Sequence, residues 1–386
     1  MPVSAASSRA RADVLFLHLG DVTGSSRALR QLRVLAAMGL AVDVVGFGAP
    51  RDTGALPDGV TLTALPMPAR GALRGPALFV AAHRAARRAA LARPTRIVLA
   101  SDLHVLPAAA AAARAHGARL AYDAREWYAG LDAAAGRPHV GWAWAAVEAR
   151  FAPRANVVFT VNDAIADRLA SARRIARPVV VHNTTDALPG VRTGALRRLV
   201  GLDEAAPLVL YQGLLRPGRG LPHLVDALAD VPGAALVIVG EGAMEGEIRE
   251  LAAERLPGRA RFVPFTPPRA LAALTPDADL GALALEPLTE SLRLALPNKL
   301  FEYAAAGVPV LAGAGIAPLR AAVEAHGAGV VADPADRAGL VAALRQGLDP
   351  AARPAFLAGV ARLHDAFRWE HDAARFREAV ARLLAG

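Results

Sequence analysis

The segment from Pro297 to Glu302 carries residue types that could bind a nucleotide. Lys299 is the only lysine in the chain, so a compact ammonium group stands where the sequence elsewhere uses arginine. Pro297 and Asn298 lead into a short expected helix, on which Lys299 and Glu302 would share a face. The carboxylate could accept hydrogen bonds from ribose or sugar hydroxyls. An ion pair within the helix, and a lysine retained by chance, are the alternatives.

A glycine-rich stretch, 213–221, follows the apolar run 208–213 and precedes a helical pattern. Gly213, Gly218 and Gly220 would let the backbone approach a ligand closely. Arg216 and Arg219 offer planar donors suited to phosphate oxygens beside a helix N-terminus. The segment is either a phosphate-binding loop or an ordinary turn with solvated arginines.

The loop after the first apolar run could also meet an anion. A helix is expected to begin near Gly20, Ser25, Ser26 and Arg27. Their hydroxyl and guanidinium groups could hold an anionic acceptor or the diphosphate of a donor. Plain capping of the helix by serine is the alternative.

Charged residues follow two further apolar runs, 96–101 and 119–124. They are Asp102, His104, Asp123, Arg125 and Glu126. Carboxyl ends of parallel strands meet at one edge of a sheet, so these side chains are expected to converge there. Burying several charged side chains together costs free energy, so their presence at this edge favours a functional role.

Two other patterns are weaker. The run 240–246 mimics a dinucleotide fingerprint, but its glycine spacing is wrong for one. Asp277 and Asp279 could pass for a metal-binding pair, yet they immediately precede an apolar strand and have no third ligand nearby in sequence. A turn between a helix and a strand is the preferred interpretation.

Short apolar runs separated by helical stretches fill both halves of the chain, and they predict parallel sheets covered on both faces. A polar, turn-rich segment at 184–194 divides them. The predicted fold is α/β, with two doubly wound, Rossmann-like lobes and a crevice at the carboxyl ends of their strands. We expect an N-terminal domain of residues 1–186 joined by a terminal helix at 367–386, and a C-terminal domain of residues 187–366.

Composition narrows the class of protein. The 386 residues include no cysteine, so a disulfide framework and cysteine catalysis are excluded, and a reducing, cytoplasmic location is expected. No apolar run is long enough to predict a membrane span. The net charge is +9, with the basic excess in residues 1–190.

The helical stretch 72–94 carries Arg74, Arg84, Arg87, Arg88 and Arg93, which could contact an anionic membrane surface or form a solvated face. Binding of nucleic acid is disfavoured, because aromatic residues, on which bases stack, make up only 5% of the chain.

Several segments together resemble the retaining, family-4-type (group 1) glycosyltransferases of the GT-B fold, in the bacterial branch that builds polysaccharides and glycolipids. The resemblance covers nearly the whole chain. It rests on LYQGLLRPGRGL (210–221), LVIVGEGAMEGEIREL (236–251), LPNKLFEYAAAGVPVLA (296–312), RWEHDAARF (368–376), YDAREW (122–127), VFTVNDAIADRL (158–169) and VVVHN (179–183).

The resemblance implies roles for individual residues. Glu302 corresponds to the second glutamate of the family's E-x7-E motif and would hold the ribose, whereas Leu294 stands where the first glutamate is usual. Arg219 replaces a lysine that binds the diphosphate, and Leu214 replaces an arginine, so that Arg216 or Lys299 would supply its charge. Further donor-binding residues are expected at Gly213, Gly240, Glu241, Pro297, Asn298 and Leu300.

The resemblance also implies an activity: transfer of a sugar from a nucleoside diphosphate sugar, UDP or GDP, with retention and without a bound metal or other cofactor. Arg219 and Lys299 would neutralise the departing diphosphate. The family's usual histidine is replaced by Arg125, so Asp123 and Glu126 are the nearest candidate nucleophiles. The acceptor would be a glycan, a lipid-linked molecule at the inner face of the membrane, or a small molecule. A sugar-nucleotide 2-epimerase and a non-catalytic binding subunit remain as alternatives.

Overall fold

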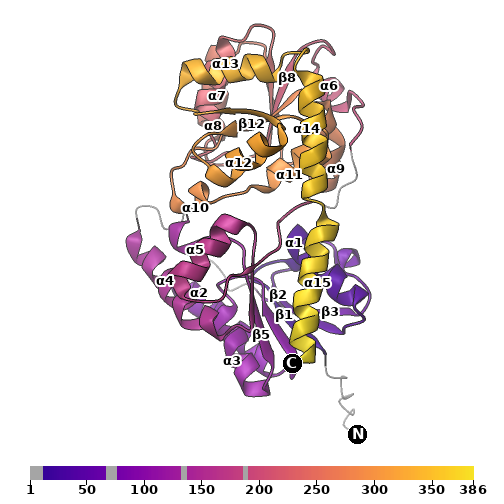
Figure 1. Ribbon diagram of the computed structural model, residues 1–386, viewed down its shortest axis with the longest axis vertical. Coiled ribbons are helices and arrows are strands. Elements are labelled where there is room, and N and C mark those ends of the chain that lie inside the picture. The colour runs from indigo at the N-terminus through magenta and orange to yellow at the C-terminus, as the bar shows by residue number, and fades with distance from the viewer. Residues whose placement is uncertain (1–11, 67–75, 132–136, 186–189) are drawn as a thin grey trace. The chain divides into compact units, whose positions relative to one another are not determined.

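The computed structural model describes residues 12–66, 76–131, 137–185 and 190–386 of the chain. These fall into two compact units (Figure 1). The first comprises residues 1–129, 133–181 and 370–386, and the second comprises residues 130–132 and 182–369. The chain therefore passes from the first unit to the second after Val181 and returns after Trp369.

The first unit is built on a parallel sheet in the order β3-β2-β1-β4-β5-β6-β7. Its strands are β1 (Val14–Leu17), β2 (Val42–Phe47), β3 (Val60–Leu65), β4 (Ile97–Ala100), β5 (Arg119–Ala124), β6 (Val157–Thr160) and β7 (Val179–Val180). The strand order reverses direction between β1 and β4, and ligands of open α/β sheets bind at such a point.

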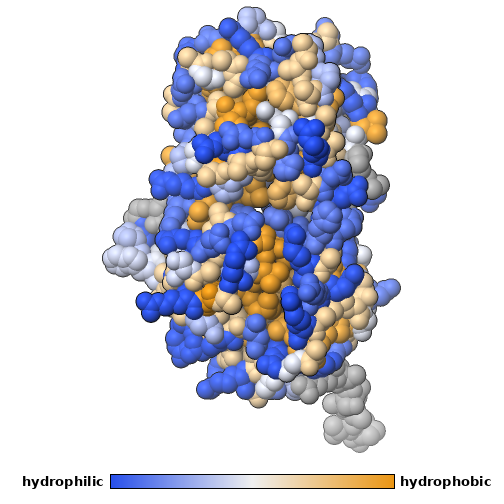
Figure 2. All heavy atoms as spheres, viewed as in Figure 1, coloured by the Kyte–Doolittle hydropathy of each residue, from blue (hydrophilic) through white to orange (hydrophobic). Residues whose placement is uncertain are grey.

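Helices on both faces bury these short apolar strands. They are α1 (Ser26–Ala37), α2 (Pro76–Leu91), α3 (Leu106–His116), α4 (Pro138–Phe151), α5 (Asp163–Arg173) and α15 (Trp369–Ala385). The side chain of Ser25 caps α1 by accepting from the Ala28 amide, and that of Asn162 caps α5 by accepting from the Ile165 amide. Figure 2 shows hydrophilic residues over much of the visible face, with hydrophobic residues visible between them in the middle of each unit.

The second unit has a parallel sheet in the order β10-β9-β8-β11-β12-β13. Its strands are β8 (Leu208–Gln212), β9 (Ala235–Val239), β10 (Ala260–Val263), β11 (Leu280–Leu283), β12 (Val310–Gly313) and β13 (Gly329–Ala332). Its helices are α6 (Ala195–Val200), α7 (Leu221–Ala229), α8 (Glu245–Arg255), α9 (Pro268–Leu274), α10 (Glu290–Arg293), α11 (Asn298–Ala305), α12 (Ala317–His326), α13 (Arg337–Gly347) and α14 (Arg353–Ala366).

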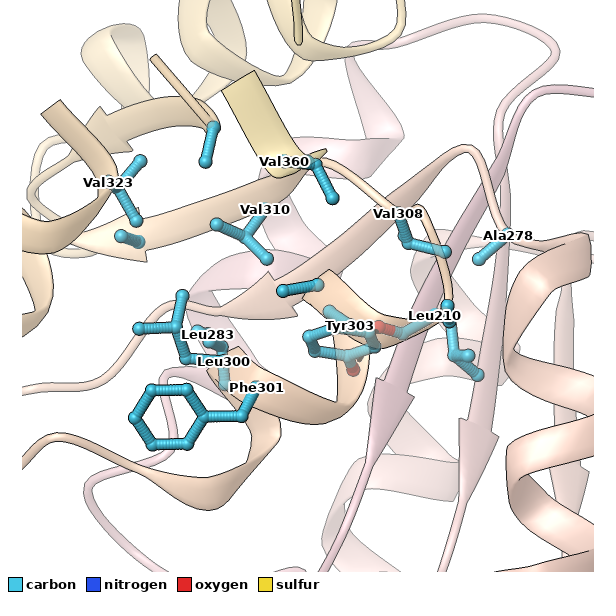
Figure 3. Packing of buried hydrophobic residues seen from close by; sticks show 14 of the residues in the cluster. Leu210, Ala278, Leu283, Leu300, Phe301, Tyr303, Val308, Val310, Val323 and Val360 are labelled. Atoms are coloured by element: carbon cyan, nitrogen blue, oxygen red, sulfur yellow. Dashed lines mark hydrogen bonds between the residues drawn. The ribbon is translucent and has the colours of Figure 1, made fainter. Parts of the chain in front are cut away.

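Two hydrophobic clusters, one on each face of this sheet, hold the second unit together. Leu208 and Leu210 of β8 belong to one cluster, and the intervening Val209 and Tyr211 belong to the other, because successive strand side chains point to opposite faces. In the first cluster, the Tyr303 hydroxyl donates to the carbonyl of Leu210 at 2.9 Å (Figure 3). This contact fixes α11, the helix of Lys299 and Glu302, against β8.

The structure confirms the predicted α/β class with two doubly wound lobes. Strand β13 was not anticipated. Its four residues, GVVA, begin with glycine and alternate between half-buried and buried positions at the edge of the sheet. None of the described helices is both long and apolar enough to cross a membrane.

Candidate functional site

Lys299 and Glu302 form an ion pair on the exposed side of α11. The Lys299 Nζ lies 3.2 and 3.0 Å from the two carboxylate oxygens of Glu302, and both side chains are about one-third exposed. The two side chains therefore share a helix face as predicted, and they form the ion pair within the helix that was the alternative to ligand binding. Because the pair is only half-buried, each group is accessible to a ligand.

Gln212, the last residue of β8, holds Glu302 from the sheet side. Its Nε2 donates to Glu302 Oε2 at 2.7 Å, while its Oε1 accepts from the Thr275 hydroxyl at 3.0 Å. Gln212 and Thr275 are buried, so Glu302 is anchored by a buried chain of hydrogen bonds. Sequence reasoning missed Gln212, although a polar residue ending an apolar strand was a usable signal.

The glycine-rich loop adjoins the Lys299 side chain. A Cβ atom placed on Gly213 would lie 3.5 Å from Cε of Lys299. Burial raises the pKa of Tyr211 to about 12, and the charges of Arg219 and Arg216 oppose this rise, so the two guanidinium groups lie near the same strand end. The loop, its arginines and Lys299 thus gather at the carboxyl end of β8.

Close backbone approaches explain two of the glycines. Gly220 has φ +65° and begins α7, and a Cβ there would lie 1.9 Å from the Ala284 carbonyl oxygen. A Cβ on Gly240 would lie 2.0 Å from the Gly213 carbonyl oxygen, because the loops after β8 and β9 are in direct contact. The Leu215 amide also donates to the Glu241 carbonyl at 2.9 Å. Only glycine fits at either position without displacing the neighbouring backbone.

The loop after β11 supplies a carboxylate that sequence reasoning did not single out. Glu286 Oε2 accepts from the Gly220 amide at 3.2 Å, and its Oε1 lies 3.4 Å from Nε2 of His223. Glu286 therefore accepts from the amide of the N-cap residue of α7 and places a negative charge at the start of this helix. Pro297 is the N-cap residue of α11, Asn298 is exposed, and Leu300 is fully buried beneath them.

In the first unit, Asp123 and Arg27 are buried against each other. Arg27 donates from Nε and Nη2 to the two oxygens of Asp123 at 2.8 and 2.6 Å, and Gln31 donates to Asp123 at 3.0 Å. Burial would raise the pKa of Asp123, but the Arg27 guanidinium holds it below its usual value. Asp123 is 0% exposed and Arg27 is 2% exposed.

These contacts argue against the roles predicted for the pair. Asp123 is too enclosed to act as a nucleophile on a sugar, and Arg27 is too enclosed to bind an acceptor. Arg27 also donates to the carbonyl of Val181 at 2.6 Å, at the point where the chain leaves the first unit. No local sequence pattern predicts this arrangement, because Arg27 and Asp123 are 96 positions apart. Both side chains are buried in this pairing.

Asp102 and His104 follow β4 as predicted, and they interact. The Asp102 carboxylate accepts from the backbone amides of His104 at 2.7 Å and Leu19 at 3.2 Å, and it lies 3.3 Å from the His104 Nδ1. Burial would raise the pKa of Asp102, yet the hydrogen bond and charge of His104 lower it. The His104 ring makes edge contacts with Tyr128 and Trp144. Asp102 therefore orients a half-exposed imidazole bordered by aromatic rings.

Two further residues, both missed by sequence reasoning, complete this cluster. Nδ1 of His18 lies 2.8 Å from the Ser101 hydroxyl, and both side chains are buried. Burial, with a smaller contribution from Arg125, lowers the pKa of His18 to about 4. His18 is therefore neutral near pH 7. His18 stands inside an otherwise apolar run, and this pattern could have indicated it in the sequence.

The remaining predicted residues of this unit lie around the same strand ends. Arg125 donates from Nη1 to the Ser25 hydroxyl at 3.3 Å, and its Nε lies 3.6 Å from Asp123. Ser26 is exposed at the start of α1, and Gly20 precedes it with φ +111°. Glu126 is exposed, unlike Asp123. Ser25 performs the capping role that was the alternative to ligand binding.

The acidic pair is a structural element of the second unit. Asp277 caps α6, accepting from the amides of Gly194 at 2.7 Å and Leu196 at 2.7 Å. Asp277 ends a short 3-10 turn, and Asp279 directly precedes β11. The interpretation as a turn between a helix and a strand fits these positions.

Comparisons with known proteins agree with this architecture. Residues 23–184 match the model of a glycosyl transferase 4-like domain, and residues 194–354 match that of glycosyl transferases group 1. The chain belongs to the group 1 glycosyltransferases. No curated protein has a significant match to the sequence.

Solved structures share the GT-B fold across nearly their whole length. A sucrose-phosphate synthase from Thermosynechococcus elongatus has a TM-score of 0.76 at 19% identity, with 97% of this chain and 99% of that chain covered. HepE of Anabaena, solved in complex with UDP-glucose, has a TM-score of 0.72 at 18% identity, with coverage of 96% and 100%. The pneumococcal O-GlcNAc transferase GtfA, in complex with UDP and GlcNAc, has a TM-score of 0.70 at 10% identity, with coverage of 98% and 100%.

Exposed apolar side chains lie in and beside the glycine-rich loop. Leu214 is 58% exposed, and Leu294 is half-buried just after α10. Leu288 is 56% exposed, and a Cβ on Gly218 would lie 3.4 Å from its Cδ1. This group 1 glycosyltransferase therefore presents two exposed leucine side chains, Leu214 and Leu288, in or beside the loop.

Proposed function

We propose that this glycosyltransferase moves a sugar from a nucleoside diphosphate sugar to a glycan, lipid-linked or small-molecule acceptor, with retention at the anomeric carbon. The observation that carries the proposal is the anchored Lys299–Glu302 pair beside Gly213 at the carboxyl end of β8. A cation and a carboxylate held this way suit a diphosphate and a ribose on one ligand.

A UDP-sugar is the donor that we favour over a GDP-sugar. HepE was solved with UDP-glucose and GtfA with UDP and GlcNAc, and both share the fold of this chain. In the proposed complex, Glu302 accepts hydrogen bonds from the ribose hydroxyls. Lys299, Arg216 and Arg219 face the phosphates, with backbone approach allowed by Gly213 and by Gly240 and Glu241 of the adjoining loop.

Departure of the diphosphate is the step that these cations would accelerate. Negative charge grows on the leaving oxygen as the glycosidic bond breaks, and preorganised cations stabilise that charge more than they stabilise the bound donor. Arg219 and Lys299 would supply this stabilisation without a resident metal or cofactor. Treatment with EDTA should therefore leave the rate of transfer unchanged, and a loss restored by Mg²⁺ would contradict this part.

Retention is proposed to proceed on the front face of the sugar, where the acceptor attacks from the side on which the nucleotide leaves. A double displacement needs an accessible carboxylate beside the anomeric carbon. Asp123 is buried in its pairing with Arg27, which leaves Glu126 as the exposed member of the two predicted carboxylates. Glu126→Gln should keep most of the activity if transfer occurs on the front face. A complete loss, with a trapped glycosyl-enzyme, would favour the double displacement.

The acceptor is proposed to bind the first unit, near His104, Arg125 and Ser26. Helix α2 of that unit offers a surface for a lipid-linked acceptor, because Val80, Arg84, Arg87 and Arg88 are exposed at helical spacing. Arg74 of the predicted basic stretch lies outside the described residues. Flotation with vesicles should depend on anionic lipid and should weaken when Arg84, Arg87 and Arg88 are changed to glutamine. Flotation that does not depend on anionic lipid would contradict the membrane-surface part of the proposal.

Sugar transfer in Lys299→Ala and Glu302→Ala tests the proposal itself. The exposed pair Arg320 and Glu324 on α12 provides matched controls in the same unit. Transfer should fall sharply in the first two variants and stay near the parent rate in Arg320→Ala and Glu324→Ala. Equal activity in all four correctly folded variants would refute the assignment. Incubation with donor alone, followed by product analysis, distinguishes transfer from epimerisation.

A further inference from the structure

A cavity of about 480 Å³ opens at the amino ends of β8 and β11, the opposite end of the second sheet from the candidate donor site. It is lined by the segment that leads into α6, the turn before β8, the end of α13 and the start of α14. Its volume is in the range of small-molecule sites, roughly 300–1,000 Å³. The charged side chains in its lining are Arg192, Arg197, Glu204, Asp279, Asp349 and Arg353.

Three arginines share one carboxylate in this cavity. Nη2 of Arg197 lies 2.7 Å from Oδ2 of Asp279, while Nη1 of Arg192 and Nη1 of Arg353 lie 2.9 and 3.1 Å from Oδ1. Oδ2 also accepts from the Leu208 amide at 2.8 Å. Asp279 is therefore saturated with donors, whereas the three guanidinium groups around it retain donor capacity. Glu204 and Asp349 balance the remaining positive charge in the lining as a whole.

Arg197 is the buried part of this group. Its side chain is 2% exposed, and its Nη1 donates to the carbonyls of Asp203 and Ala206 at 2.8 and 2.7 Å. Its Nε is buried and has no hydrogen-bond partner among the residues that the structure describes. A buried donor without an acceptor is unfavourable. The rest of this guanidinium is held by Asp279, Asp203 and Ala206, so Arg197 is a fixed positive charge in the cavity wall.

The other two arginines can turn to a ligand without exposing Asp279. Arg192 and Arg353 are 40% and 30% exposed and compete for the same oxygen, Oδ1. If both moved to a phosphate, Arg197 and the Leu208 amide would still pair Oδ2 of Asp279. Bidentate arginines are well suited to phosphate oxygens.

The rim of the cavity carries carboxylates in place of guanidinium groups. Glu204 and Asp349 are exposed carboxylates that line it, and they could accept hydrogen bonds from hydroxyl groups but would repel a second anion. We propose that this cavity binds a small phosphorylated sugar, with the phosphate on Arg192 and Arg353 and the hydroxyls toward Glu204 and Asp349. This site is separate from the proposed donor site and does not depend on the proposed function.

Calorimetric titration with glucose 6-phosphate tests the proposal, with inorganic phosphate and neutral glucose as comparison ligands at equal ionic strength. The titration is made in a Lys299→Ala background, so that a phosphate at the proposed donor site contributes less. The test variant combines Arg192→Gln with Arg353→Gln. The control combines Arg249→Gln with Arg337→Gln, two exposed, ion-paired arginines of the same unit that do not line the cavity.

Glucose 6-phosphate should bind the background protein more tightly than inorganic phosphate, and glucose should not bind. The double change at the cavity should raise the dissociation constant at least tenfold, while the control should leave it unchanged. Circular dichroism confirms that each variant is folded. Absence of binding overturns the proposal, as does binding that survives the double change, or binding of inorganic phosphate alone. Sugar transfer is measured in parallel with the double cavity change made in the parent protein, which keeps Lys299. Transfer should persist there, so the two proposals fail separately.

Discussion

Replacing Gln212 tests whether the second unit positions Glu302 for a ligand. Its Nε2 donates to Glu302 at 2.7 Å and its Oε1 accepts from Thr275 at 3.0 Å. Gln212→Leu removes both bonds while keeping the side chain buried. A hydrogen bond to a charged group contributes about 1.5–3 kcal/mol, but Glu302 is one-third exposed and water can replace part of that. We therefore expect a loss of about 1 kcal/mol in the free energy of unfolding.

The donor should respond more specifically than stability does. A Glu302 released from Gln212 must be reordered when the donor binds, so KM for the donor should rise about five- to tenfold, the equivalent of about 1–1.4 kcal/mol. Of the two hydrogen bonds of Gln212, Thr275→Val removes only the one to Thr275, so it should raise KM for the donor less. Gln31→Leu is the matched control, because Gln31 is also buried and donates to a carboxylate, Asp123, in the first unit.

The measurements are urea unfolding and steady-state kinetics at varied donor concentration. Gln31→Leu should lower stability without changing KM for the donor. If Gln212→Leu behaves in the same way, Gln212 is merely structural and the reasoning about Glu302 is refuted.

Two further expectations concern the first unit. Arg27→Ala removes the two shortest contacts of the buried Asp123 carboxylate and leaves it with Gln31 at 3.0 Å and Arg125 at 3.6 Å. The protein should lose roughly 3–5 kcal/mol of stability in urea unfolding, and a change within about 1 kcal/mol would show that the pair does not stabilise this region. His18 has its pKa lowered from 6.5 to about 4, so the unfolded chain binds more protons between these pH values and stability should fall by up to ~3 kcal/mol as pH drops through that window. His18→Asn should flatten this part of the pH profile of unfolding, and an unchanged slope would contradict the assignment.

The fold was largely predictable because its strands are short, apolar runs that helical stretches separate. The run 208–213, for example, became β8, with its alternate side chains in two clusters. Strand β13 escaped notice because Gly329 and partial exposure weaken its pattern. Periodicity reports which residues are buried, and an edge strand with few buried residues gives little signal.

The site was predictable only where its residues are close in sequence. Lys299 and Glu302 share a face because helical spacing requires it. The partner of Glu302 is Gln212, 90 positions earlier, and the partner of Asp123 is Arg27, 96 positions earlier. Strand order decides both pairings, and no local pattern reveals it. For that reason Asp123 was predicted as a catalytic group, and the arginines around Asp279 were not noticed.

Binding of UDP to Glu302→Ala and to Glu324→Ala, measured by calorimetry, tests the central claim most directly. Loss of hydrogen bonds between a carboxylate and the ribose, at about 1.5–3 kcal/mol, should weaken UDP binding by about ten- to a hundredfold in Glu302→Ala. Glu324→Ala should bind UDP as the parent protein does. Equal affinity in the two folded variants would contradict the placement of the nucleotide at α11.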